Sequence, residues 1–119
     1  MERRNIVLEK SIEFALIIIE FSERLEHQKK FVIARQILKS GSSIGANISE
    51  AQSIESKADF LHKMKIAAKE AEETKYWLIL CKLSQSYPFE DSILLLLDEI
   101  QKLLSAIISS SKQNTLPSH

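Results

Sequence analysis

A few short patterns in this sequence contain residue types that could do chemistry. Asp59 and His62 are spaced as Asp-x-x-His, which is half of the carboxylate-histidine pattern that holds two metal ions in helical bundles. No second copy of the pattern occurs, and the other two histidines, His27 and His119, fall in an expected connection and an expected tail. We therefore interpret His62 as a surface residue, and we expect no metal and no cofactor.

Two further patterns could serve phosphate binding or nucleophilic catalysis. Gly41 and Gly45 are spaced as in a glycine-rich loop, but a phosphate-binding loop continues with Lys and Ser or Thr, whereas Ala46 and Asn47 follow here. Cys81, the single cysteine, falls on a long expected helix with no histidine nearby in the sequence. We interpret Cys81 as a structural thiol and expect no catalytic residue, so the sequence predicts a protein that is not an enzyme.

A set of polar residues on two expected helices leaves two interpretations open. The carboxylates could be solvated, with contacts to Lys69 or Lys75 along their own helix. They could instead form a partly buried polar network that joins the two helices, because buried carboxylates must be paired or hydrogen-bonded. Both roles are structural. The set comprises Ser43, Asn47, Glu50, Glu70 and Glu73.

The elements that position these residues are expected to be helices only. The chain has 119 residues, which suits one domain, and it is 45% hydrophobic with only two Gly and two Pro. Apolar spacing of three and four residues predicts helices at about 5–26, 31–53, 57–86 and 89–111. Short connections then favour an antiparallel up-down-up-down four-helix bundle over residues 1–112, with a disordered tail at 113–119.

The first helix has a wide apolar face, as expected for a bundle helix. Its seam is accompanied by a second apolar stripe beside it. The seam contains Val7, Ser11, Phe14, Ile18, Phe21 and Leu25, and the second stripe contains Leu8, Ile12, Ala15 and Ile19.

Gly41 and Gly45 lie inside the second expected helix, although each glycine costs a helix about 1 kcal/mol of propensity. Their spacing removes side chains from successive turns, so we expect another helix to approach closely there.

The third helix has more apolar surface than one bundle position needs. Its main face runs from Phe60 to Leu78, and a second set, which includes Ile66, Trp77 and Leu80, lies well around the helix. A contact between subunits is the simplest source of a second burial surface. We therefore expect Ile66, Trp77 and Leu80 at an oligomer interface.

The distribution of charge bears on which partners the protein could bind. Sixteen basic and sixteen acidic residues balance, but Lys29, Lys30, Arg35 and Lys39 occur in a stretch, residues 27–49, that has no acid. This stretch could be a solvated face or a strip that contacts phosphates of a nucleic acid.

The single cysteine and the absence of a signal pattern predict a cytoplasmic protein. The longest apolar runs, at 15–19 and 93–97, are too short to span a membrane.

Three stretches together resemble a known family. They are "SGSSIGANISEA" at 40–51, "DF" at 59–60 and "KIAAKEAEETKYWL" at 65–78. In this combination the chain resembles the bacterial four-helix-bundle proteins encoded in intervening sequences of 23S ribosomal RNA genes. It is also similar to the accessory variability proteins of diversity-generating retroelements.

The resemblance implies a bundle that assembles as a ring-shaped homopentamer without enzyme activity, a scaffold or adaptor. An alternative role, acting with structured RNA or a reverse transcriptase, is what the retroelement branch implies. That branch uses a strongly basic surface, whereas this chain has a formal net charge of zero.

Overall fold

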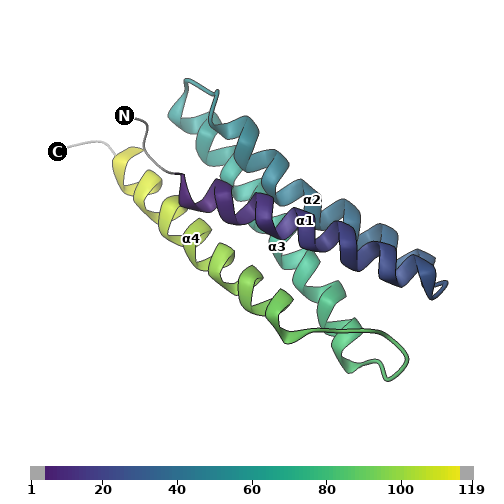
Figure 1. Cartoon of the computed structure of the whole chain (residues 1–119). Coiled ribbons are helices and arrows are strands. Elements are labelled where there is room, and N and C mark those ends of the chain that lie inside the picture. The colour runs from purple at the N-terminus through teal and green to yellow at the C-terminus, as the bar shows by residue number, and fades with distance from the viewer. Residues whose placement is uncertain (1–4, 116–119) are drawn as a thin grey trace.

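The computed structural model describes the backbone of residues 5–115 and the side chains of residues 5–112. Over this part of the chain there are four α-helices and no strand: α1 (Ile6–His27), α2 (Phe31–Ala51), α3 (Lys57–Leu83) and α4 (Asp91–Thr115). Each helix packs against the next one along the chain, and α4 also packs against α1 (Figure 1). The prediction of an all-α protein with four helices is confirmed.

The helix ends follow local capping. Asn5 caps α1 by accepting a hydrogen bond from the Leu8 N–H at 3.1 Å. Ser56 caps α3 by accepting one from the Asp59 N–H at 3.3 Å, a role that serine often has at a helix start. Between α1 and α2, Lys29 has a left-handed φ of 64°, which turns the chain within a short connection.

The last two helices differ from their predicted bounds. α3 ends at Leu83 and not at 86, because Ser84 takes an extended conformation (φ −86°, ψ 128°) and its N–H donates to the Leu80 and Cys81 carbonyls. α4 begins at Asp91 and continues to Thr115, past the predicted end at 111, since no helix breaker occurs before Pro117. Residues 116–119 of the predicted tail lie outside the described residues.

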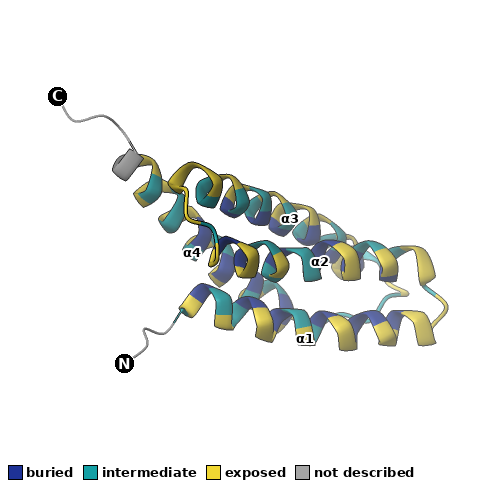
Figure 2. Ribbon diagram, turned by 90° about the horizontal axis from the view of Figure 1, so that it is seen from above, coloured by how far each residue is buried: buried dark blue, intermediate teal, exposed yellow. Residues whose placement is uncertain are grey.

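All four helices contribute to one apolar core. Every residue of the predicted α1 seam is buried, including the polar Ser11, and the buried side of each helix faces inward (Figure 2). The largest fully buried side chains are Phe14, Ile18, Phe21, Leu25, Ile37, Ile44, Ile48, Met64, Leu78, Leu97, Ile100 and Leu104. None of the described helices combines the length and apolar character needed to cross a membrane.

At the two glycines of α2, α1 and α2 approach each other closely. A Cβ atom added at Gly41 would lie 2.9 Å from Ile18 Cγ2, and one added at Gly45 would lie 3.1 Å from Ser11 Oγ. The two helices run in opposite directions, because the later glycine meets the earlier residue of α1. The predicted close approach at the two glycines is confirmed.

Candidate interaction site

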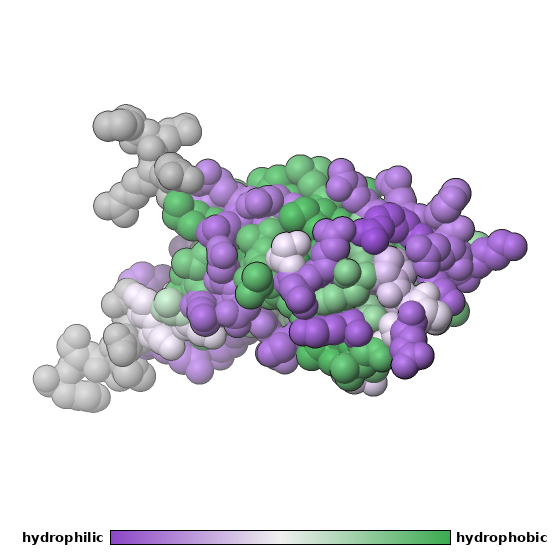
Figure 3. Space-filling model, turned by 60° about the horizontal axis from the view of Figure 1, so that its bottom comes forward, coloured by the Kyte–Doolittle hydropathy of each residue, from purple (hydrophilic) through white to green (hydrophobic). Residues whose placement is uncertain are grey.

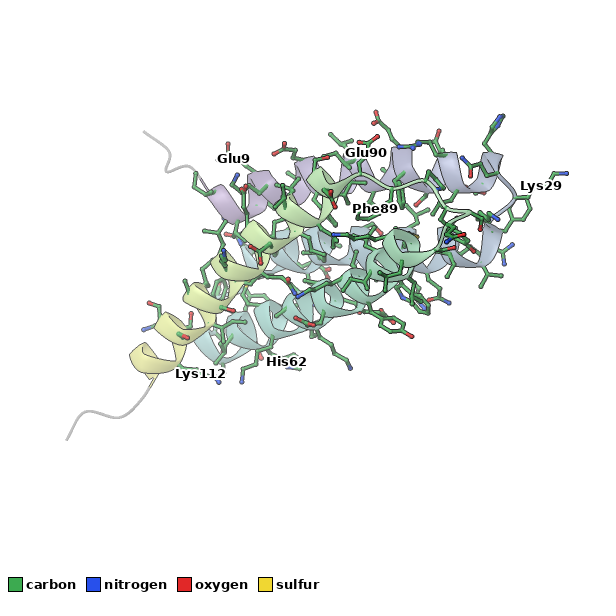
Figure 4. All side chains as sticks on the ribbon, turned by 90° about the horizontal axis from the view of Figure 1, so that it is seen from below. Glu9, Lys29, His62, Phe89, Glu90 and Lys112 are labelled. Carbon is green, nitrogen blue, oxygen red and sulfur yellow. The ribbon has the colours of Figure 1, made fainter. Side chains whose placement is uncertain are left out.

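The residues considered for metal binding do not gather. Asp59 and His62 are both exposed near the start of α3, and His27 is exposed at the end of α1. Figure 4 shows His62 at the opposite end of the bundle from Lys29, which lies in the connection that follows His27. Among the described residues, no group of three or more His, Cys, Asp or Glu side chains could hold a metal ion.

Cys81 lies on the inner side of α3. Its side chain is buried, and desolvation by burial raises the pKa of the thiol to about 11. The thiolate is the nucleophilic form of cysteine, so at neutral pH this side chain is protonated and unreactive. Cys81 therefore acts as a small apolar residue in the core.

The predicted polar set is divided into separate parts. The Ser43 hydroxyl donates to the Lys39 carbonyl at 2.7 Å, and the Asn47 amide donates to the Ser43 carbonyl at 2.8 Å, so both bonds stay within α2. Glu50 does join the two helices, through an exposed ion pair with Lys63 of α3 at 3.3 Å. Glu70 and Glu73 lie elsewhere along α3 and form no bond to these residues that the structure records.

Glu70 and Glu73 line an open cavity between α2 and α3. Gln36 and Lys39 of α2 line its other side, Lys69 completes it, and its volume is about 370 Å³. We call these five residues the outer groove. Glu50 pairs with Lys63 while Lys39 faces Glu70, so α2 and α3 run in opposite directions along it.

The pKa of Glu70 in the outer groove is raised. Burial is the largest cause, followed by the negative charge of Glu73 and a hydrogen bond with it. Lys69 and Lys39 act in the opposite direction but do not cancel these effects. The ionised Glu70 carboxylate is thus incompletely compensated within one chain.

Apolar side chains border one end of the outer groove. One turn beyond Gln36 and Glu73, the two helices carry Val32, which is 74% exposed, and Trp77, which is half-buried. Leu80 is 38% exposed on the next turn of α3. The Trp77 ring makes an edge contact with Tyr76, with centroids 5.2 Å apart. Its Nε1 is buried and has no hydrogen-bond partner within the described residues.

Ile66, Trp77 and Leu80, which the sequence predicts at an interface, are only partly covered in one chain. Ile66 and Trp77 are half-buried, and Leu80 is exposed. Sequence reasoning did not select Val32 or Tyr76, which are 74% and 57% exposed. Val32 could have been found, because it follows the start of α2 on the side away from the isoleucine face.

The four basic residues of the acid-free stretch do not form one strip. Lys29, Arg35 and Lys39 are exposed, and Lys39 faces the outer groove. The Lys30 ammonium lies 4.8 Å from the centre of the Tyr87 ring, so Lys30 turns toward the connection between α3 and α4. Arg35 and Lys39, one helical turn apart, are the pair that faces outward from α2.

A second apolar surface lies on α1. Ile12, Leu16 and Ile19 are 52%, 60% and 41% exposed, and we call them the α1 stripe. The sequence places Ile12 and Ile19 in a wide bundle face; the structure instead leaves them on the outside, because Ser11 and Ile18 take the inner positions against α2. Figure 3 shows hydrophobic patches, in green, between hydrophilic side chains, in purple, on the surface of the molecule.

Fold and surfaces together define a four-helix protein that leaves apolar side chains exposed on its outer faces. The chain belongs to the family of 23S rRNA-intervening sequence proteins, whose model matches residues 3–107. The resemblance inferred from the sequence is thereby confirmed.

Among solved structures, the chain is similar to a protein of unknown function from the S23 ribosomal protein family of Bacteroides thetaiotaomicron. The two are 48% identical, with a TM-score of 0.82, over 86% of this chain and 97% of that one. None of the curated proteins matches the chain.

Proposed function

We propose that this protein is a non-enzymatic scaffold or adaptor that works as a homo-oligomer. In this proposal, copies of an antiparallel up-down-up-down bundle bind one another and present repeated surfaces to a partner. The observation that carries it is the α1 stripe, in which three large apolar side chains on successive turns are 41% to 60% exposed. Apolar residues scattered singly over a monomer need no explanation, whereas a contiguous apolar surface marks a contact.

The outer groove supports the same proposal from another side of the molecule. Val32 and Leu80 are exposed at its end, and Trp77 is only half-buried. Fully burying a large apolar side chain contributes about 1.5–3 kcal/mol, so covering these residues would recover a substantial part of that amount for each. Tryptophan is among the residues that contribute most to protein interfaces.

The family resemblance supports a ring-shaped homopentamer as the form of the oligomer, and we propose that it acts without cofactor in the bacterial cytoplasm. Light scattering on the purified chain at about 1–100 μM tests the proposal, because an assembly dissociates with dilution by mass action. We expect a mass several times the 13.6 kDa of one chain. A folded species that keeps the single-chain mass over the whole range would disprove the scaffold.

A second candidate function is nucleic-acid binding beside ribosomal RNA or a reverse transcriptase. The observation that favours it is the exposed pair Arg35 and Lys39, repeated in every copy of an oligomer. Titration with a structured RNA at low salt and at about 0.15 M, where the screening length is about 8 Å, tests it. Affinity that survives the higher salt supports binding as a function, and its complete loss there leaves only nonspecific attraction.

A further inference from the structure

The α1 stripe and the outer groove differ in shape and charge. The α1 stripe is the convex outer side of one helix, whereas the outer groove is a hollow between two helices. Exposed Glu13, Glu20 and Glu23 lie within one turn of the stripe. The bases of α1 turn the other way, because Lys10 pairs with Glu99 at 2.7 Å and Arg24 pairs with Glu90 at 3.0 Å.

The outer groove, counted together with Arg35 at its border, carries one more base than acid. Lys39 and Lys69 line it, and Arg35 is exposed one turn from Lys39. Before Glu50, α2 contains no acid. The outer groove also contains Glu70 and Glu73, which balance Lys39 and Lys69 in number, so Arg35 at its border supplies the base in excess.

We propose that the α1 stripe of one copy docks in the outer groove of the next copy, so that each subunit gives one surface and receives the other. The contact places Ile12, Leu16 and Ile19 against the apolar end formed by Val32, Trp77 and Leu80. It also places the acids beside the stripe near Arg35, Lys39 and Lys69. This pairing rests on the proposed homo-oligomer and assigns the surfaces through which the copies bind.

Contacts between identical surfaces are less favourable in both charge and shape. Two α1 stripes face to face would bring Glu13, Glu20 and Glu23 against their own equivalents, and such like-charge contacts suppress association. Two outer grooves face to face would oppose two hollows and leave their apolar ends incompletely covered. Complementary shape and complementary charge therefore both select the pairing of stripe with groove.

The positions of the two surfaces also determine how the contact repeats. Around the bundle the packing order is α1, α2, α3 and α4, since α1 packs against α2 and α4 but not against α3. The stripe on α1 and the groove between α2 and α3 thus lie on different sides of one subunit. A contact between two different surfaces repeats from copy to copy, and it forms a ring when the rotation closes.

Three leucines on helices provide matched variants for a test. Leu16 belongs to the α1 stripe, Leu80 borders the outer groove, and Leu95 lies on α4 outside both; they are 60%, 38% and 65% exposed. We expect Leu16→Asp and Leu80→Asp each to reduce the mass measured by light scattering to that of one chain. The matched control, Leu95→Asp, should keep the wild-type mass.

Mixing the two defective variants separates a stripe-to-groove contact from a contact between identical surfaces. Leu16→Asp retains an intact groove and Leu80→Asp retains an intact stripe, so an equimolar mixture should form a heterodimer with twice the 13.6 kDa mass. It should grow no further, because the two remaining surfaces both carry a new aspartate. Circular dichroism checks that each variant is folded, and Ile12→Asp replaces Leu16→Asp if that variant unfolds.

The possible outcomes distinguish a failure of the stripe-to-groove pairing from a failure of the homo-oligomeric scaffold. If the wild type is an oligomer but the mixture stays at the single-chain mass, the stripe does not meet the groove and the scaffold still stands. A Leu16→Asp variant of wild-type mass overturns the pairing in the same way. A monomeric wild type disproves the scaffold itself, and the pairing with it.

Discussion

The two sides of α2 differ in how tightly the chain packs against them. Toward α1, a methyl group added at Gly41 would lie 2.9 Å from Ile18 Cγ2 and one added at Gly45 would lie 3.1 Å from Ser11 Oγ, so both contacts are tight. Toward the outer side of α3, Lys39 and Gln36 face Glu70 and Glu73 across a cavity of about 370 Å³. One side of the same helix is thus sealed within the chain, and the other remains open to a partner.

The largest expected effect is on the sealed side. Gly41→Leu should lower the free energy of unfolding by about 3 kcal/mol, since the added side chain meets Ile18, which is fully buried. The melting temperature should fall by about 10 °C. Gly41→Ala should cost much less, because the gain of about 1 kcal/mol in helix propensity offsets part of the clash.

Gly45→Ala is the matched control for that pair. Its Cβ would lie 3.1 Å from the Ser11 hydroxyl and not against a branched carbon, so it should be the mildest of the three changes. Thermal melts by circular dichroism rank them. Equal melting temperatures for Gly41→Leu and Gly41→Ala would mean that the sealed side is looser than the structure indicates.

The next effect in size is on the open side. Trp77→Ala should lower the assembly state, because truncating a tryptophan at the centre of an interface typically costs about 2 kcal/mol or more of binding. The half-buried ring contributes to one chain as well, so the monomer should be somewhat less stable. Leu95→Ala on α4 serves as the control, and light scattering measures the mass. An unchanged mass for Trp77→Ala would remove Trp77 from the interface.

The sealed side could be predicted from the sequence, whereas the open side could be predicted only in part. Helical spacing identifies the α1 seam, and two glycines one turn apart remove the side chains that would keep a neighbouring helix away. Spacing alone does not tell whether Ile12 and Ile19 face the core or a partner, since both produce the same apolar pattern.

The polar residues of the second and third helices show a further limit. Ser43 and Asn47 share a stripe with Glu50, which leaves a network open as one interpretation, but both side chains bond to their own helix backbone one turn earlier. That choice depends on side-chain rotamers, which no residue pattern specifies. The end of α3 is similar, because nothing in Ser84, Gln85 or Ser86 requires the helix to stop at Leu83.

A smaller effect is expected from pH in the outer groove. Because the pKa of Glu70 is raised above its ordinary 4.5, the folded chain holds this proton more tightly than the unfolded chain does. Stability should therefore fall as the pH rises from about 4.5 through the folded-state pKa. Glu70→Gln removes the uncompensated charge, so it should melt higher than the wild type at about pH 7.

Acidification provides the control for that variant. Near pH 4 the Glu70 carboxyl becomes protonated in both folded and unfolded chains, so the advantage of Glu70→Gln should shrink. Glu50→Gln should behave differently, because it breaks the exposed ion pair with Lys63, and such pairs contribute about 0–1 kcal/mol. If Glu70→Gln melted lower than the wild type at neutral pH, the carboxylate would be stabilising and the outer groove would be electrostatically complete.

The smallest effect concerns adjacent residues on opposite sides of α3. Cys81 is buried and the pKa of its thiol is raised to about 11, so a thiol reagent at about pH 8 should leave it unmodified until the chain unfolds. Leu80, its neighbour, is 38% exposed, so a Leu80→Cys variant carrying Cys81→Ala should react readily as a dilute monomer. Raising the concentration should slow that reaction, because association covers Leu80 at the end of the outer groove, and a rate independent of concentration would leave Leu80 outside the contact. The reaction rates of the thiols at positions 80 and 81 therefore distinguish packing within one chain from contact with another copy.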